Sequence, residues 1–373
     1  MRSIIDYLAE NVRRRPDATA VYFREREITF ADLERDAARC RGALAALGVK
    51  PGERVALAMS DCPEMMVALL GVIGLGAIVV PCSTMLKPAE LEYMLTDSGA
   101  KLVIVTPEHL DNAKAAKAQK IVVAPDEFNE LLNKSSGVPL GRLEADTPCL
   151  ILYTSGTTGP PKGAVHLQDH IPETIERTRP VYELQPDDRL FSSSRLFFAY
   201  GLGNSFSFPI GNGCSTILCT ERPTPQLIAD IFKRYRPTVF FAVPAVFRAL
   251  IEYARQGNPL ETKSLKFCVS AGEVLPVATW NEWKDVSGVE IVETIGTTEM
   301  LHAFISNRKD RNKPGSSGLA MDGYQVKLLD EHGNAVEGAG RGALHVQGRS
   351  AIPYYLNKPE KTAELIKDGW VKT

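Results

Sequence analysis

The chain has 373 residues, of which 44% are hydrophobic and 24% charged, so it is long enough for two or three subdomains. Its 43 basic and 45 acidic residues nearly cancel, which argues against a nucleic-acid-binding protein, because such proteins need a basic surface. Its seven cysteines include no C-x-x-C pair, and this indicates reduced core residues of a cytoplasmic protein rather than disulfides or zinc ligands.

The first part of the chain alternates helix and strand patterns. Residues 31–47 repeat apolar side chains at three- and four-residue spacing, as in a helix, and Gly48 ends the pattern. A continuous apolar strand follows at 54–59, and further apolar strands lie at 77–80, 101–105 and 120–124. Short apolar strands separated by helices predict a parallel sheet that is covered on both faces.

One stretch, 65–82, is uncharged and close to the length of a membrane span. Three glycines and Pro81 interrupt it, so a buried helix, a glycine turn and a short strand describe it better. The apolar start of the chain is broken by Asp6 and Glu10, and it therefore does not predict a secretory signal. We expect a protein that does not contact a membrane.

A second alternating unit runs from 146 to 315, with strands at 149–153, 215–219, 238–243 and 291–296. From Gly318 onward, the segments 325–330 and 342–348 are typical of antiparallel strands joined by a glycine turn. We therefore predict an α/β fold with two doubly wound βαβ subdomains and a small antiparallel β subdomain. The predicted boundaries are 1–140, 141–317 and 318–373.

The strand at 149–153 runs into a loop with the sequence YTSGTTGPPKG, residues 153–163. Open α/β sheets bind their ligands at the carboxyl ends of strands. Most Gly/Ser/Thr clusters are plain surface turns, but four hydroxyls, two glycines and a lysine at this density favour a nucleotide phosphate. The P-loop template G-x-x-x-x-G-K-[ST] fails, because Pro161 replaces its second glycine and Gly163 its Ser or Thr. The expected phosphate contacts are Thr154, Ser155, Gly156, Thr157, Thr158, Gly159 and Lys162.

Further motifs resemble those of the adenylate-forming superfamily, which includes acyl-CoA synthetases, peptide-synthetase adenylation domains and luciferases. TSGTTGPPKG (154–163) is similar to its phosphate loop, and SAGE (270–273) to its adenine-side loop. IGTTE (295–299) resembles the motif with a threonine and a magnesium-binding glutamate. Because 342–362 and 369–373 resemble the end of the family's N-terminal domain, the resemblance covers essentially the whole chain.

The resemblance implies a reaction in which a carboxylate attacks the α-phosphate of ATP and yields acyl-AMP and pyrophosphate. The loop then only has to hold the departing phosphates. The family's catalytic positions match Lys162, Thr298 and Glu299, with Glu299 as the Mg²⁺ ligand. The other nucleotide contacts that it implies are Gly272, Glu273, Glu293, Ile295 and Thr298.

Three positions near these motifs do not follow the family's pattern or allow two interpretations. Many relatives have an aromatic residue at the position of Ile295, which offers adenine only an apolar face. Glu293 could accept a hydrogen bond from the adenine amino group, or it could be a plain surface glutamate. Ala343 replaces the acid of the family's GEL triplet, and the sequence does not explain this change.

FFAYGLGN (197–204), ERPTP (221–225) and IGTTEMLH (295–302) resemble the benzoate-CoA ligase branch most closely. A slot floored by Gly and Ala suits a flat ring better than a long acyl chain. His302 could hold the carboxylate or a ring substituent, or be a satisfied core residue, whereas Phe206 and Phe208 are expected in the core. The aryl pocket that the resemblance implies is lined by Ala199, Tyr200, Gly201, Ala271, Gly296, His302 and Ala303.

Ala303 stands where we expect a bulkier aliphatic residue in a strict benzoate enzyme. The free space favours a substituted ring, such as amino- or hydroxybenzoate. The implied enzyme is an AMP-forming aryl-CoA ligase that uses ATP, Mg²⁺ and coenzyme A. Two alternatives stay open, namely an adenylation module that loads a carrier-protein thiol and a non-catalytic protein that binds aryl acid and nucleotide. Family members continue with a mobile C-terminal domain, which is absent from these 373 residues.

Overall fold

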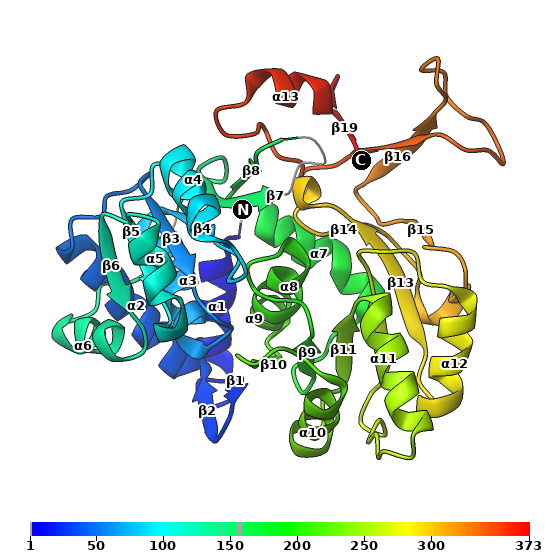
Figure 1. Ribbon diagram of the computed structural model, residues 1–373, viewed down its shortest axis with the longest axis horizontal. Helices are drawn as coiled ribbons and strands as arrows, with labels where there is room; N and C mark the ends of the chain where they lie inside the picture. The colour runs from blue at the N-terminus through cyan, green and yellow to red at the C-terminus, as the bar shows by residue number, and fades with distance from the viewer. Residues whose placement is uncertain (1, 142, 155–158) are drawn as a thin grey trace.

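The computed structural model describes residues 2–141, 143–154 and 159–373. Two large sheets and one small sheet form its frame (Figure 1). The six-stranded sheet has the order β6-β5-β3-β4-β7-β8, and the nine-stranded sheet has the order β15-β14-β13-β12-β11-β9-β10-β1-β2. The four-stranded sheet, β16-β17-β19-β18, is entirely antiparallel.

The six-stranded sheet confirms the parallel arrangement predicted for the first part of the chain, since only its β7–β8 pair is antiparallel. Its strands are β3 (Arg54–Ala58), β4 (Ile78–Pro81), β5 (Leu102–Val105), β6 (Lys120–Val123), β7 (Pro148–Thr154) and β8 (Lys162–Leu167). The helices of this region are α2 (Phe30–Ala46), α3 (Pro63–Leu75), α4 (Pro88–Ser98), α5 (Leu110–Ala115) and α6 (Asp126–Lys134).

The nine-stranded sheet is parallel in its middle and ends in antiparallel pairs at both edges. Its strands are β1 (Thr19–Phe23), β2 (Arg26–Thr29), β9 (Arg189–Ser192), β10 (Ser215–Ile217), β11 (Val239–Ala242), β12 (Phe267–Ser270), β13 (Ile291–Gly296), β14 (Ala303–Ser306) and β15 (Leu319–Ala320). The helices of this part are α1 (Ile4–Arg14), α7 (His170–Tyr182), α8 (Ala199–Leu202), α9 (Phe208–Asn212), α10 (Pro225–Tyr235), α11 (Pro244–Arg255) and α12 (Val277–Ser287).

The two large sheets are not built from consecutive segments of chain. β1 pairs in parallel with β10, so the start of the chain belongs to the nine-stranded sheet. β7 and β8 come after residue 140 but belong to the six-stranded sheet. The boundaries at 140 and 317 therefore stay predictions about the chain, and they do not coincide with the limits of the sheets.

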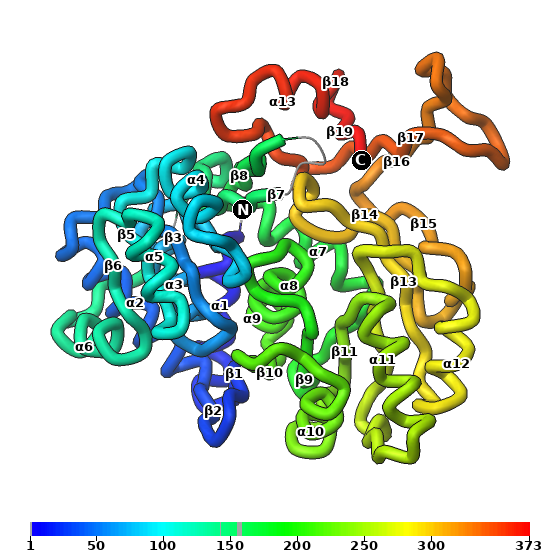
Figure 2. Tube along the Cα trace, in the orientation of Figure 1, coloured from blue at the N-terminus to red at the C-terminus, as the bar shows by residue number. Residues whose placement is uncertain are grey.

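The C-terminal segment confirms the predicted strand pair at 325–330 and 342–348. β16 (Gln325–Leu329) and β17 (Ala343–Gln347) run antiparallel, and a turn at Gly333 lies between them. β18 (Ile366–Lys367), β19 (Trp370–Lys372) and α13 (Pro359–Leu365) complete this part. The β16–β17 hairpin projects away from the rest of the molecule, while α13 lies over the end that carries β7 and β8 (Figures 1 and 2).

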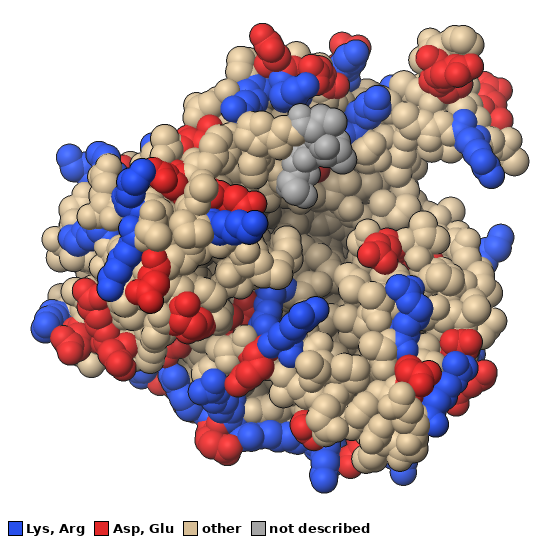
Figure 3. Space-filling view, viewed as in Figure 1, with Lys and Arg blue, Asp and Glu red and all other residues tan. Residues whose placement is uncertain are grey.

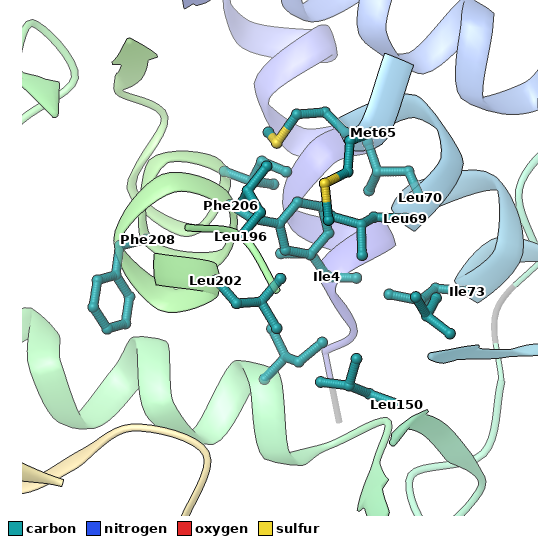
Figure 4. Close-up of a cluster of buried hydrophobic side chains, with 14 of the residues drawn as sticks. Ile4, Met65, Leu69, Leu70, Ile73, Leu150, Leu196, Leu202, Phe206 and Phe208 are labelled. Carbon is teal, nitrogen blue, oxygen red and sulfur yellow. The ribbon is translucent and has the colours of Figure 1, made fainter. Parts of the chain in front are cut away.

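α3 explains the uncharged stretch 65–82, because all of its residues are buried. Pro63 stands at its first turn, and Gly76, with φ at +83°, ends it before β4. Its apolar side chains join those of α8 and the following turn, including Phe206, in one cluster (Figure 4). Phe208 also lies in this cluster, so both phenylalanines are core residues as predicted. No described helix is both long and apolar enough to cross a membrane.

Candidate active site

The predicted phosphate loop connects two antiparallel strands. β7 and β8 pair along their length, and the last pair joins Thr154 to Lys162. α4 holds both ends, because Tyr153 donates a hydrogen bond to Asp97 (2.7 Å) and Tyr93 donates one to the carbonyl of Pro161 (3.1 Å). Ser155, Gly156, Thr157 and Thr158 lie outside the described residues.

The lysine at the end of this loop reaches a tyrosine and a glutamate from distant parts of the chain. The Lys162 Nζ atom lies 4.7 Å from the centre of the Tyr355 ring, a cation–π contact. The Tyr355 hydroxyl donates a hydrogen bond to Glu299 Oε1. Burial, followed by the carboxylate of Glu299, raises the pKa of Tyr355 above its usual value, so the hydroxyl keeps its proton. Lys162 and Glu299, predicted as catalytic, are thus brought together, and Tyr355 between them was not predicted.

Glu299 and Thr298 lie in a short 3-10 turn, η3 (Thr298–Met300), between β13 and β14. A backbone N–H of the C-terminal segment, that of Ile352, donates to the Glu299 carbonyl (2.9 Å), and the Ser350 hydroxyl donates to the Met300 carbonyl (2.9 Å). Leu301, which follows the turn, has φ at +64°, a costly conformation for a branched side chain. The surrounding hydrogen bonds therefore hold the turn in a shape that its sequence alone would not favour.

A cavity of about 310 Å³ opens beside this turn. In the space-filling view, the middle of the molecule's face is hollowed and its walls are mainly uncharged (Figure 3). Of the seven residues predicted for the aryl pocket, all except Gly201 line the cavity. The lining residues that were not predicted as site residues are Ser194, Phe198, Val243, Thr294 and Thr297.

Gly201 lies behind the cavity wall. A Cβ atom there would stand 2.0 Å from the carbonyl oxygen of Arg195 and 2.6 Å from that of Ser194, so glycine permits close packing of two backbone segments. Gly296 does the same on the cavity floor, where a Cβ atom would stand 2.6 Å from the His302 carbonyl oxygen. The small residues thus let the strands approach closely and leave the slot flat.

His302 is buried, and its ring contacts the ring of Phe208 edge-on at 4.6 Å between centres. Its Nε2 atom lies 3.2 Å from Asn204 Oδ1, whereas no described residue hydrogen-bonds to its Nδ1 atom. Burial lowers the pKa of His302 to about 3, so the ring is neutral near pH 7. With Nε2–H donating to Asn204, the buried Nδ1 atom carries no proton and can only accept a hydrogen bond.

The residues predicted for the adenine side lie at the carboxyl ends of β12 and β13. Gly272 and Glu273 are exposed after β12, and Ile295 is half-buried and pairs with Ile305 of β14. Glu293 is only 5% exposed, so the alternative of a plain surface glutamate is wrong. Its Oε1 atom accepts hydrogen bonds from the Ser317 hydroxyl (3.0 Å) and the Leu275 N–H (3.5 Å).

A family model described as "AMP-binding enzyme" matches residues 8–356. The chain belongs to this family. It is 36% identical to the benzoate–CoA ligase of Thauera aromatica over 359 residues, 92% of this chain and 68% of that protein. It is 32% identical to a 4-hydroxybenzoate–CoA/benzoate–CoA ligase of Rhodopseudomonas palustris, which it matches over 99% of its own length and 71% of the relative's.

Solved structures of this family show the same fold. A benzoate CoA ligase from Burkholderia xenovorans LB400 superimposes with a TM-score of 0.94 at 33% identity, over 100% of this chain and 77% of that one. An anthranilate CoA ligase in complex with anthranoyl-AMP superimposes with a TM-score of 0.95 at 33% identity, over 100% of this chain and 74% of that one. The family and the fold class predicted from the sequence are thereby confirmed.

Proposed function

We propose that the protein activates a benzoate-type acid with ATP to give aryl-AMP and pyrophosphate, and then transfers the aryl group to CoA. The observation that carries this proposal is the position of Thr298. It lines the aryl cavity, and it directly precedes Glu299, which belongs to the Lys162–Tyr355–Glu299 cluster. An acid in the cavity would therefore have its carboxylate beside the groups that suit a triphosphate.

In this proposal, the chain contributes binding, orientation and charge. The ring occupies the cavity, whose apolar walls exclude water, and a carboxylate oxygen attacks the α-phosphorus while the bond to the pyrophosphate oxygen breaks. The Lys162 ammonium group stabilises the negative charge that moves onto the pyrophosphate. Tyr355 holds Lys162 over its ring and Glu299 through its hydroxyl, so that both charges stand ready before the nucleotide binds.

The residues also fit the Mg²⁺ ion that we propose for the nucleotide. Mg²⁺ commonly takes only one or two protein carboxylates and completes its octahedron with phosphate oxygens and waters. The described residues contain no group of three or more possible metal ligands, and Glu299 is the carboxylate of this cluster. Bound beside Glu299, the ion would neutralise charge on the phosphates.

The imidazole of His302 favours aryl acids that carry a hydrogen-bond donor on their own ring. Its Nδ1 atom is a buried, unpaired acceptor, and a carboxylate, which also only accepts, cannot satisfy it. An amino or hydroxyl substituent can. We therefore propose amino- or hydroxybenzoate as substrates, with benzoate accommodated less well because it leaves Nδ1 unpaired. We also infer that the protein works in the cytoplasm, because its cysteines are free.

Two measurements test the proposed function. Calorimetry with a non-hydrolysable sulfamate analogue of benzoyl-AMP measures adenylate binding directly. ATP–pyrophosphate exchange is measured with benzoate, 2-aminobenzoate and 4-hydroxybenzoate, with octanoate as the control acid. We expect tight binding of the analogue and exchange with the aryl acids only. Absence of both binding and exchange, or equal exchange with octanoate, would contradict the proposal. Thioester formation measured with CoA and with a carrier protein then distinguishes the two possible acceptors.

A further inference from the structure

Two buried histidines lie directly behind the Thr298–Glu299 turn, and the proposed reaction does not use them. His166 belongs to β8 and is 0% exposed, whereas His170 is the first residue of α7 and is 2% exposed. Their Nδ1 atoms are 3.1 Å apart, and the rings meet nearly at right angles. The Nε2 atom of His166 lies 2.9 Å from the carbonyl oxygen of Thr298. A chain of two hydrogen bonds therefore runs from α7 to the turn that carries Glu299.

The chemistry of these contacts fixes both protons. A backbone carbonyl only accepts, so His166 must carry its proton on Nε2 to bond Thr298. Burial lowers the pKa of His166 well below its usual value and that of His170 to about 4, so both rings are neutral near pH 7. The Nδ1 atom of His166 is then a bare acceptor. Since it faces the Nδ1 atom of His170, His170 must be the donor and carry its proton there.

The surroundings of His170 agree with this assignment. Its Nε2 atom, which should then lack a proton, stands 3.8 Å from Asp169 Oδ1, too far for a hydrogen bond. That oxygen has no hydrogen-bond partner among the described residues. The other oxygen of Asp169 accepts from Arg349 Nε at 2.9 Å. At this distance Asp169 does not accept a hydrogen bond from Nε2, and the 3.1 Å contact with His166 Nδ1 therefore decides that the proton is on Nδ1.

The hydrogen bond from His166 completes the support of the turn. The three carbonyls of η3 are each held by a donor from elsewhere in the fold, namely the His166 ring for Thr298, the Ile352 N–H for Glu299 and the Ser350 hydroxyl for Met300. Two of these donors belong to the C-terminal segment, and His166 is the one that comes from the strand after the phosphate loop. It therefore couples the strand of Lys162 to the turn of Glu299.

We propose that His166 is a positioning residue for the Thr298–Glu299 turn, and that His170 keeps it in the Nε2–H tautomer that this task requires. A pair that only fills space in the core would need no particular tautomer and would not matter for the adenylate. In the role proposed here, the proton on Nε2 aligns the Thr298 carbonyl, and with it the Glu299 Cα atom two bonds further along the backbone, from which the carboxylate side chain extends. This inference rests on the proposed function for its effect on catalysis, but its structural part stands alone.

The tautomers are measured directly on the unaltered chain. Its six histidines are labelled with ¹⁵N, and long-range ¹H–¹⁵N spectra distinguish Nε2–H from Nδ1–H rings. We expect His166 as Nε2–H and His170 as Nδ1–H, with a scalar coupling across the Nδ1–H···Nδ1 hydrogen bond, whereas the exposed His332 averages its tautomers. A His166 ring protonated on Nδ1, or a pair that titrates near pH 6.5, would overturn the inference.

Two matched variants test the role. The amide nitrogen of glutamine reaches the position of a histidine Nε2 atom, whereas that of asparagine reaches only the position of Nδ1. H166Q should therefore keep the donor to Thr298, and H166N should lose it, although both remove the imidazole. We expect adenylate-analogue affinity and pyrophosphate exchange within about threefold of the unaltered chain for H166Q and a loss of about tenfold or more for H166N.

Equal losses in H166Q and H166N would show that the ring matters only through packing, and the positioning role would be wrong. Thermal unfolding of both variants identifies a general loss of stability, and the spectra of the unaltered chain decide the tautomers even where a variant does not fold. An unaltered chain that binds no adenylate analogue would refute the proposed function, while the tautomer result would still hold or fail by itself.

Discussion

Replacing Ala303 by isoleucine should narrow the substrate range. The Ala303 side chain is buried on the cavity wall, in β14 opposite Gly296, which has no side chain to move aside. Isoleucine adds three carbon groups to a cavity of about 310 Å³ that must also hold the ring. One methylene group in an apolar pocket is worth about 1–3 kcal/mol of selectivity, or roughly 10–200-fold. We expect the kcat/KM of A303I to fall by that factor for acids with a substituted ring and to stay unchanged for benzoate.

The assay compares kcat/KM for ATP–pyrophosphate exchange with benzoate, 3-hydroxybenzoate and 4-hydroxybenzoate. A320I serves as the control, because Ala320 lies in the adjacent strand β15, outside the cavity lining, and receives the same three carbons. The result is expressed as kcat/KM for a substituted acid divided by kcat/KM for benzoate. This ratio does not depend on the amount of active protein. An unchanged ratio in A303I, or the same change in A320I, would refute the placement of the ring against Ala303.

Three further changes test the charged groups. Lys162→Ala should slow exchange by about 2–4 kcal/mol, measured as kcat/KM for ATP, because the leaving pyrophosphate loses a cation; an unchanged rate would remove Lys162 from the mechanism. Glu299→Gln should need much more Mg²⁺ for half-maximal exchange, and an identical Mg²⁺ titration would leave Glu299 a structural role. Asp61 is buried, and this raises its pKa from 3.8 to about 7, although Arg195 and the Leu196 N–H lower it. Between these pH values the folded state therefore holds a proton on Asp61 that the unfolded state releases. The stability that this proton contributes is fully present below pH 4 and is lost as the pH rises to 7. The free energy of unfolding of Asp61→Asn, measured in urea, should therefore rise relative to that of the unaltered chain by up to about 4 kcal/mol between pH 4 and pH 7. A difference between the two proteins that stays constant with pH would contradict the raised pKa.

The strands and helices of the fold could be predicted from the sequence because each carries a local pattern. Apolar runs predicted β3 to β6, and the glycine-bounded segments predicted β16 and β17. The pairing of β1 with β10 could not be predicted in this way, since the two strands are almost two hundred residues apart and nothing local specifies such a partner. β8 was also missed, because Pro160 and Pro161 end the phosphate loop and hide the return of the chain as an antiparallel strand.

The residues predicted for the aryl pocket come in short motifs, and six of the seven line one cavity. Gly201 was the exception, since a glycine in such a motif can serve backbone packing as well as a ligand, and only the close approach of Arg195 distinguishes the two. Tyr355 and His166 carried no separate signal. Each is linked by a hydrogen bond to a turn far away in the chain, and the sequence does not show which distant carbonyl or carboxylate a side chain will meet.

The two walls of the aryl cavity should evolve under different constraints. One wall consists of His302 and Ala303, only a few residues after Glu299 in a tightly held turn, so that a change there that suits a new ring also shifts the groups that we propose for the triphosphate. The other wall, Ala199 and Tyr200 of α8, comes from a separate part of the chain. Substitutions at Ala199 should therefore disturb the turn less than substitutions at His302 or Ala303, whereas Tyr200, whose ring centre lies 5.5 Å from that of His302, is coupled to the first wall. Natural divergence and laboratory selection for new aromatic acids should accumulate at Ala199 first.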